Sequence, residues 1–193
     1  CDGMGNMTEL NDWLANNGGA TASDACSGVT WSNDYDALSD DCGATGSATV
    51  TFTATDDCGN ASSTTATFTI EDTTNPSIDM MAEDSTVECD GMGNMTELND
   101  WLANNGGATA SDACGGVTWS NDFVALSDDC GATGTATVIF TATDDCGNAS
   151  TTTATFTIED TTNPSIDMMA EDSTVECDGM GNMTELNDWL ANN

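Results

Sequence analysis

The chain has 193 residues and no Lys, Arg or His, against 34 Asp and Glu, so its formal net charge is −34. Without a cationic side chain it cannot neutralise phosphates, which excludes nucleic acids and anionic membrane surfaces as partners. It also lacks the His or Lys on which most acid–base and nucleophilic catalysis depends, so we expect no enzymatic activity. A glycosidase needs only two carboxylates in a cleft, and nothing in the sequence marks a cleft.

The composition indicates a folded, disulfide-stapled protein rather than a disordered polyanion. Apolar residues make up 38% of the chain and charged residues only 18%, which is too apolar for a disordered chain. The nine Cys residues indicate disulfides and therefore an oxidising, extracellular environment. No hydrophobic run reaches membrane-spanning length, so we predict a cell-surface or secreted location without membrane insertion.

An 88-residue repeat dominates the sequence. The run CDGMGNMTELNDWLANN begins at Cys1, Cys89 and Cys177, and only six differences separate the overlaid periods. The polar segment from Glu71 to Pro76 suits a linker that leads into an edge strand. We therefore predict a first repeat lacking its first strand (residues 1–72, repeat 1), a complete repeat (residues 73–160, repeat 2) and the start of a third (residues 161–193), cut from a longer array.

Within repeat 2 the pattern predicts strands and one helix. Short strands are expected over residues 77–82, 85–89, 108–112 and 117–121. Between them, Asn94 and Glu97 have capping-box spacing, and Leu98, Trp101 and Leu102 form one apolar helix face. Alternation with Thr over residues 136–142 and 154–158 predicts a hairpin around the loop at Asp144. The fold class is mainly β: tandem immunoglobulin-like sandwiches, each with one short inserted helix.

These motifs resemble a known family. The TATDDCGN loop, the Thr-rich strand that follows it, the Asp-Thr-Thr-x-Pro linker and the SDAC segment occur in both periods. Together they resemble HYR (hyalin-repeat) modules, which occur in tandem in large secreted bacterial surface proteins. The resemblance implies a stalk or adhesive spacer. The run DGMGNMTELNDWLANNGG departs from the short HYR module and is similar to a longer, helix-bearing variety.

Each period holds four Cys, which allow three pairings. In a sandwich, the loops that carry Cys114 and Cys146 meet at one pole, and Cys89 and Cys130 lie at the other. Cys130 and Cys146 are separated by most of a strand, about 25 Å at ~3.3 Å per residue, beyond disulfide reach. We therefore predict pairs within each repeat and a partner for Cys177 outside the sequence. The predicted pairs are Cys89–Cys130, Cys114–Cys146, Cys1–Cys42 and Cys26–Cys58.

Acidic residues gather at the two poles that should face each other between repeats. Carboxylate and amide oxygens are the ligands that Ca²⁺ prefers, and Mg²⁺ or a zinc site suits this composition less well. The alternative is that these residues form solvated turns. We expect Ca²⁺ at the junctions. The candidate ligands are Asp2, Asp40, Asp41, Glu71 and Asp72 on one pole, and Asp112, Asp144, Asp145 and Asn148 on the other.

Two further surface features bear on function. The motif Asp-Ser/Thr-Thr resembles a bacterial O-glycosylation signal and occurs at Thr73, Ser85, Thr161 and Ser173, so the chain is a candidate glycoprotein. Rows of Thr on the last hairpin, such as Thr137 and Thr155, form either a glycan- or surface-binding array or simply the solvent face of a sheet.

The sequence thus supports two functions. The first is a structural segment of an extracellular filament or adhesin stalk, stapled by disulfides and stiffened by Ca²⁺, whose partners are neighbouring repeats, with lateral self-association left open. The second is an adhesive module that binds glycans through its loops or Thr rows. The near identity of the repeats favours the structural role.

Overall fold

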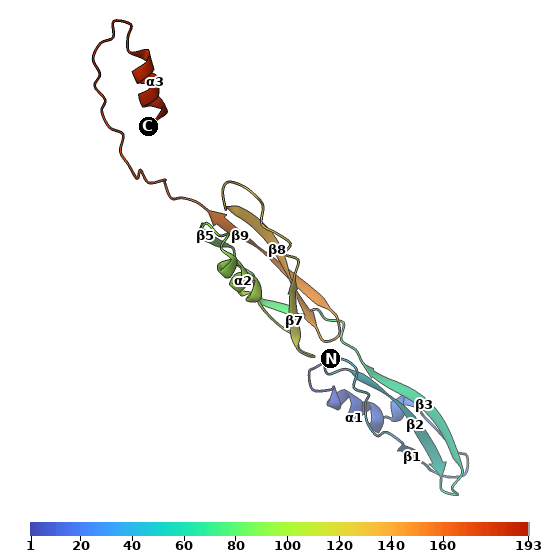
Figure 1. Cartoon of the computed structure of the whole chain (residues 1–193). Coiled ribbons are helices and arrows are strands. Elements are labelled where there is room, and N and C mark those ends of the chain that lie inside the picture. Colours follow the sequence, from blue (N-terminus) through green and yellow to red (C-terminus); the bar gives the residue numbers. More distant parts are fainter. Residues whose placement is uncertain (193) are drawn as a thin grey trace. The chain divides into compact units, whose positions relative to one another are not determined.

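The computed structural model describes residues 1–192 and separates into two compact units, Cys1–Asp160 and the segment from Thr161 onward. The first unit contains repeats 1 and 2 (Figure 1). The helices are α1 (Met7–Ala15), α2 (Met95–Ala103) and α3 (Met183–Ala191), with 3-10 turns η1 (Asn17–Gly19) and η2 (Asn105–Gly107). The strands are β1 (Val29–Asn33), β2 (Gly46–Asp56), β3 (Ala61–Ile70), β4 (Ser77–Met80), β5 (Ser85–Glu88), β6 (Thr109–Ser111), β7 (Val117–Asn121), β8 (Gly134–Asp144) and β9 (Ala149–Glu159).

The prediction of a mainly β protein with short helices is confirmed. Repeat 2 holds a four-stranded sheet in the order β5-β9-β8-β7 and a two-stranded sheet of β4 and β6. β5 pairs with β9 in parallel, whereas β7, β8 and β9 are antiparallel neighbours. In repeat 1, which has no counterpart of residues 77–88, the sheet contains β1, β2 and β3.

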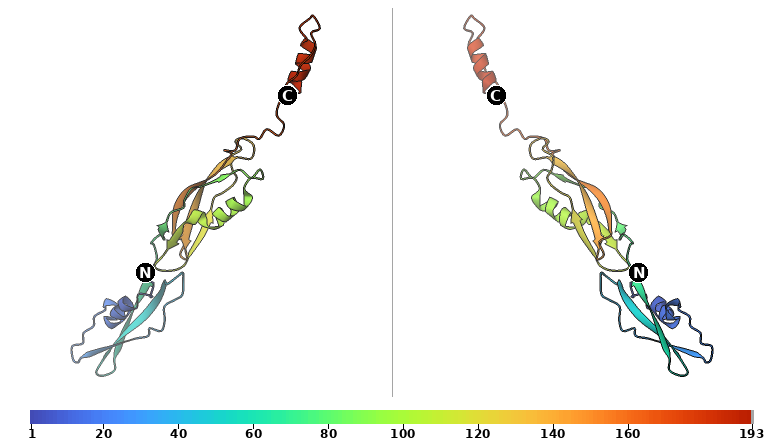
Figure 2. Two further views of the ribbon diagram at one scale, coloured as in Figure 1. Left: turned by 90° about the vertical axis from the view of Figure 1, so that its left-hand side faces the viewer. Right: turned by 90° about the vertical axis from the view of Figure 1, so that its right-hand side faces the viewer.

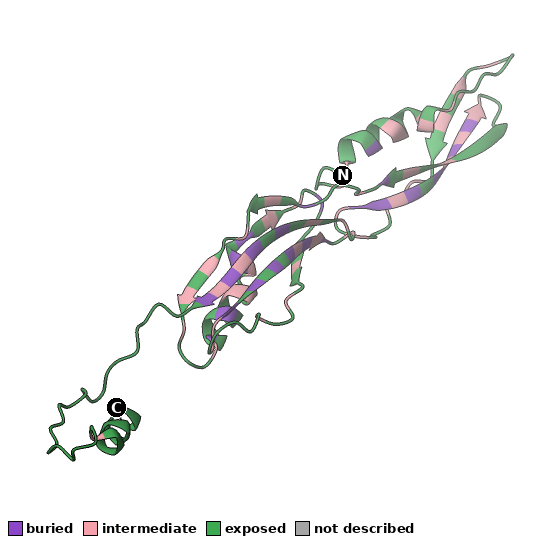
Figure 3. Cartoon of the chain, turned by 90° about the horizontal axis from the view of Figure 1, so that it is seen from above, coloured by how far each residue is buried: buried purple, intermediate pink, exposed green. Residues whose placement is uncertain are grey.

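The core of repeat 2 lies between the four-stranded sheet and α2, which covers one sheet face (Figure 2). Leu98 on α2 is 1% exposed and packs against the fully buried Phe156 of β9. Trp101, one helical turn further on, packs edge-on against Phe140 of β8, with the ring centroids 5.2 Å apart. The expected apolar helix face is therefore the side that meets the sheet, because the i, i+3 positions share one side of a helix. The alternation of burial along β8 and β9 is visible in Figure 3.

The predicted capping box at the start of α2 is wrong. Asn94 adopts a left-handed backbone with φ 47° and makes no side-chain cap bond to the helix. Instead its amide nitrogen donates to the Glu88 carbonyl (3.0 Å), and its amide oxygen accepts from the Asp90 backbone N–H (3.1 Å). Asn tolerates left-handed backbone better than most residues, so it ties the helix start to β5 rather than to the helix itself.

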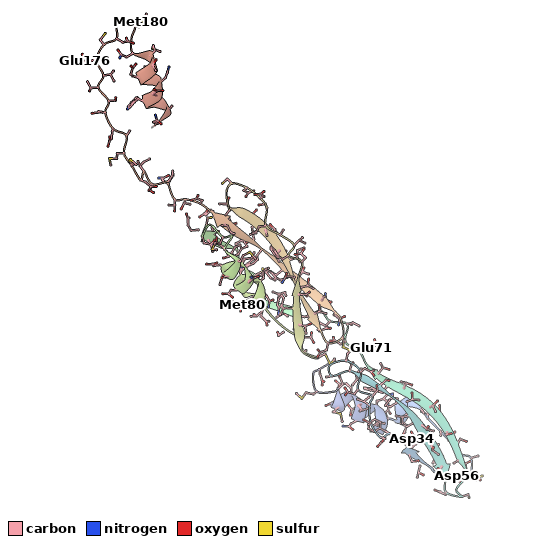
Figure 4. The ribbon with its side chains drawn as sticks, in the orientation of Figure 1. Asp34, Asp56, Glu71, Met80, Glu176 and Met180 are labelled. Atoms are coloured by element: carbon pink, nitrogen blue, oxygen red, sulfur yellow. A yellow bond between two sulfur atoms is a disulfide. The ribbon has the colours of Figure 1, made fainter. Side chains whose placement is uncertain are left out.

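The segment from Thr161 repeats the start of repeat 2 but forms no strand among its described residues. It contains α3, whose Trp189 ring nitrogen donates to the Glu171 carbonyl (3.1 Å), as Trp101 donates to Glu83 in repeat 2 (3.0 Å). Leu186 is 44% exposed, whereas its counterpart Leu98 is buried, because this segment has no sheet to pack against. Glu176 and Met180 mark the turn before α3 (Figure 4).

Candidate functional site: the junction between repeats

Two disulfides join repeat 1 to repeat 2. Cys1 is bonded to Cys114, with their Cα atoms 5.8 Å apart, and Cys42 is bonded to Cys146, with their Cα atoms 5.1 Å apart. The predicted pairs Cys1–Cys42 and Cys114–Cys146 are therefore wrong in this structure. Cys26–Cys58 and Cys89–Cys130 are not formed either, because Cys26, Cys58, Cys89, Cys130 and Cys177 are free.

The predicted pairs are wrong because they join cysteines within one repeat and leave out bonds between the facing poles of two repeats. Cys114 and Cys146 do meet the same neighbouring surface, and so do Cys1 and Cys42, as the pole argument required. However, the pole of repeat 2 abuts the pole of repeat 1, so each sulfur meets a sulfur of the adjacent repeat. The N-terminal Cys1 consequently lies where the two repeats meet (Figure 1).

Backbone contacts support the two disulfides. The Ala44 N–H donates to the Cys114 carbonyl (2.6 Å), and the Asn148 side-chain amide donates to the Asp72 carbonyl (3.2 Å). Gly43 has φ 56° and faces the Cys114 carbonyl so closely that a Cβ atom would collide with it. Glycine meets both demands, since it accepts positive φ and allows close backbone approach. The sequence signal for this contact was the Cys-Gly pair at Cys42, which sequence reasoning missed.

Of the nine predicted Ca²⁺ ligands, the structure brings the carboxylates of only Asp72 and Asp112 together at the junction. The carboxylates of Asp72 and Asp112 lie within 4.8 Å of each other and of the Cys114 sulfur. That sulfur is in a disulfide and supplies no thiolate. Because Ca²⁺ takes six to eight oxygen ligands, these two carboxylates alone leave most of the coordination to water.

The other candidates are engaged elsewhere or exposed. Asp144 accepts from the Cys146 and Asn148 backbone N–H groups (both 2.9 Å), and Asp145 accepts from the Gly116 N–H (2.8 Å). Asp2 accepts from the Met4 and Asn6 N–H groups in the turn before α1. Asp40, Asp41 and Glu71 are exposed, and Figure 4 places Glu71 at the repeat boundary. The nine residues therefore do not form one site.

The charge state of Asp144 reflects its surroundings. Burial raises the pKa of this carboxyl, but hydrogen bonds from the Asn148 side chain and from nearby backbone N–H groups outweigh burial. The net result is a pKa below the ordinary value. The counterpart Asp56, at the far end of repeat 1 (Figure 4), has its pKa lowered chiefly by the Asn60 side chain. In each repeat this Asp–Asn hydrogen bond holds the loop that carries Cys146 or Cys58.

The remaining surface predictions stay open. Thr73, Thr161 and Ser173 are exposed, whereas Ser85 is half-buried in β5 and is the least accessible of the proposed glycosylation positions. On the Thr rows, the hydroxyls of Thr137 and Thr155 bond to each other (3.2 Å), which leaves fewer groups free to bind a ligand.

The chain matches no protein-family model and no curated protein. Within residues 1–192, no helix combines the length and the apolar character needed to cross a membrane. The resemblance to HYR modules therefore stays a prediction.

Proposed function

We propose that this chain is a structural segment of an extracellular filament or adhesin stalk, whose consecutive repeats are cross-linked by two disulfides. We further propose that each repeat is a variant of the immunoglobulin-like sandwich, with α2 and the β4–β6 pair as its second layer. The observation that carries the proposal is the Cys42–Cys146 bond between repeats. Disulfides persist in oxidising compartments, which supports the extracellular location.

The position of this bond gives the chain a short covalent path under tension. From Cys58 the path follows β2 to Cys42, crosses the disulfide to Cys146, and follows β8 to Cys130. Sixteen residues separate Cys42 from Cys58 and Cys130 from Cys146, and each strand contains eleven residues. A β-strand is already close to the maximal extension of the chain. Unfolding a repeat therefore adds little length to this path.

A tether with this path resists extension even when its domains unfold. Without the cross-link, the chain between Cys58 and Cys130 is 72 residues long, about 250 Å when fully extended at ~3.5 Å per residue. Through the disulfide, the same two points are joined by two chain segments of sixteen residues each, about 110 Å when fully extended. This difference suits a fibre that must hold its length under load.

Force spectroscopy on the full chain tests the mechanical role. With Cys26, Cys89 and Cys177 changed to Ser, handles attached to Cys58 and Cys130 should give a maximal extension of about 110 Å, rising to about 250 Å after reduction. The control separates the two disulfides, because only one shortens the path between the handles. C42S/C146S should behave like the reduced chain, and C1S/C114S like the parent. A maximal extension of about 250 Å in the oxidised parent would contradict the proposal.

Only Asp72 and Asp112 are placed to hold a Ca²⁺ ion together at the junction. We propose that Ca²⁺ binds weakly between Asp72 and Asp112, where two carboxylates meet at the junction with no cationic side chain in the sequence to offset them. Two carboxylates and water ligands place such a site among weak extracellular calcium sites, with dissociation constants on the order of 10⁻⁴–10⁻³ M.

A further inference from the structure

All ten methionines of the chain have exposed side chains. The smallest exposed fraction is 48%, at Met7, and the largest is 88%, at Met180. Methionine is among the residues that proteins most often bury, because its flexible apolar side chain fills gaps in a core. The core of this chain contains other apolar residues instead. In repeat 2 its large members are Leu98, Val138, Phe140, Phe156 and Ile158.

The four methionines of repeat 2 lie at two places on its surface. Met80, labelled in Figure 4, ends β4 and is 56% exposed, and the following Met81 is 76% exposed. Met92 lies in the turn before α2, and Met95 is the first residue of that helix. They are 85% and 54% exposed. These side chains thus remain in water although repeat 2 contains both of its sheets and its helix.

The turn that carries Met92 has a fixed backbone. The Asp90 carboxylate accepts from the Met92 N–H (2.6 Å) and from the Asn94 N–H (3.1 Å). Gly91 and Gly93 flank Met92 with φ 76° and 87°, a left-handed backbone that glycine adopts without strain. The hydrogen bonds hold the backbone of the turn, while the one side chain between the two glycines extends into water.

Contact with a neighbouring repeat leaves this turn exposed. In repeat 1 the same turn lies at the junction, where Gly3 faces the Ala113 carbonyl so closely that a Cβ atom would collide with it. Met4, the counterpart of Met92, is nevertheless 81% exposed. Met92 is exposed with β5 before it in the chain, and Met4 is exposed with a neighbouring repeat against its turn. Neither the strand nor the junction therefore covers this side chain.

An exposed thioether sulfur is accessible to oxidants. Oxidation converts methionine to its sulfoxide, a polar side chain that disrupts a core. Because every methionine of this chain is exposed, a sulfoxide oxygen formed at any of them can bond to water. The largest fully buried side chains belong to Phe, Leu and Val, which contain no sulfur. The core can therefore keep its packing while the surface reacts.

We propose that the surface methionines consume small uncharged oxidants, such as hydrogen peroxide and hypochlorous acid, while the repeats stay folded. The sulfur lone pair attacks one oxygen of hydrogen peroxide, so that an S–O bond forms and the O–O bond breaks. The sulfur loses two electrons, and the departing hydroxide takes the proton of the transferred hydroxyl and leaves as water. One peroxide gives one sulfoxide and one water. Hypochlorous acid gives one sulfoxide, one chloride and one proton.

The charge of the chain selects among oxidants. Its net charge of −34 repels anions, so uncharged oxidants approach the sulfur atoms more readily. Each 88-residue period contains four methionines, so the capacity for oxidant grows with the number of repeats. The proposal goes beyond the mechanical role, because sulfoxide formation needs no tension and leaves the disulfides between repeats in place.

Titration with hypochlorous acid in mildly acid solution tests the capacity. The parent is the full chain with its five free cysteines changed to Ser. We expect Trp fluorescence to hold until ten equivalents are added, one per methionine, because the polarizable thioether reacts before the indole. Changing Met80, Met81, Met92 and Met95 to Leu, which has nearly the same volume, should move this limit to six, ten less the four removed. The same limit in both proteins would overturn the proposal.

Hydrogen peroxide tests whether the fold survives. After mass spectrometry shows ten added oxygens, we expect the melting temperature of the parent to be unchanged. Leu98→Met is the matched control, because Leu98 is 1% exposed. The methionine introduced there should oxidise at least about tenfold more slowly than the others, because oxidant reaches it only when the repeat opens. Its oxidation should lower the melting temperature. A lower melting temperature in the fully oxidised parent would overturn the proposal.

Discussion

Cys42 and Cys146 are 104 residues apart in the sequence, yet their Cα atoms lie 5.1 Å apart and their sulfurs are bonded across the boundary between repeats. Repeat 1 contributes Cys1 and Cys42 to the two bonds, and repeat 2 contributes Cys114 and Cys146. The cysteines at the same positions of the other repeat, Cys89, Cys130, Cys26 and Cys58, are free. The two repeats thus use different halves of the same set of four cysteines.

Disulfide mapping should recover Cys1–Cys114 and Cys42–Cys146 from oxidised protein. Trypsin has no cleavage site here, so cleavage at Asp is required. The differences Ser27/Gly115, Ser47/Thr135 and Ser63/Thr151 lie in peptides that carry paired cysteines, so the two repeats can be told apart by mass. Recovery of Cys114–Cys146 within one repeat would contradict the junction.

Reduction should uncouple the repeats. A disulfide that closes a loop of about 100 residues contributes on the order of 4–5 kcal/mol. We expect one calorimetric transition in the oxidised protein and two after reduction, with repeat 1 melting first because residues 1–72 contain no counterparts of β4 and β5. Ile70→Val should shift only the lower transition and Ile158→Val only the upper one, each by the ~0.5–1.5 kcal/mol that this substitution costs in a core. Coincident transitions after reduction would show that the disulfides do not couple the repeats.

The fold was largely predictable, and the junction was not. Alternating Thr and apolar residues placed β8 and β9, and the Leu98 to Leu102 pattern placed α2, because these signals are local. Cysteine pairing depends on which pole meets which neighbour, and one repeat holds no information about that. The left-handed backbone of Asn94 was missed because Asn serves equally well as a helix cap. The Asp72–Asp112 pair was predicted to lie at the junction, but its isolation from the other acids was not.

The two Asn residues before α1 and α2 form a matched pair for mutation. Asn94→Ala should destabilise repeat 2 by about 1–3 kcal/mol, because it removes the bond to Glu88 from a site that is 3% exposed and strains the left-handed backbone. Asn6→Ala should cost less, because repeat 1 contains no counterpart of Glu88. Urea denaturation of the reduced protein measures both. Equal losses of stability in the two variants would show that the hydrogen bond from the Asn94 side chain to β5 contributes nothing.

Calcium should stabilise the junction through Asp72 and Asp112. At ten times the dissociation constant, binding adds about 1.4 kcal/mol to the free energy of unfolding. Asp112→Asn should remove this increase while keeping the oxygen that accepts from the Cys114 N–H. Asp24→Asn is the control, because Asp24 is the same position in repeat 1 and belongs to no cluster of three metal-ligating side chains among the described residues. Melting curves with Ca²⁺ and with chelator at fixed ionic strength measure the effect. An equal stabilisation of both variants by Ca²⁺ would contradict calcium binding at the junction.

Stability should pass through a maximum in mildly acid solution. As pH falls from 7 toward the ordinary pKa of carboxyl groups, about 4, the net charge of −34 shrinks and the repulsion between like charges falls with it. Stability should therefore rise first. This trend is opposite to that of a protein held together by ion pairs between acidic and basic side chains, since this chain contains no basic side chain.

Below about pH 3.8 the trend should reverse. Hydrogen bonds lower the pKa of Asp34, Asp56, Asp90 and Asp144 below the ordinary value, so near this pH the folded protein binds fewer protons than the unfolded chain. The stability that these carboxylates contribute is fully present above their unfolded pKa and is lost as pH falls through the folded pKa. Melting temperatures of the oxidised protein from pH 2 to 8 measure both limbs. Asp56→Asn and Asp144→Asn should flatten the acid limb, and a monotonic fall from pH 7 downward would contradict the role of charge repulsion.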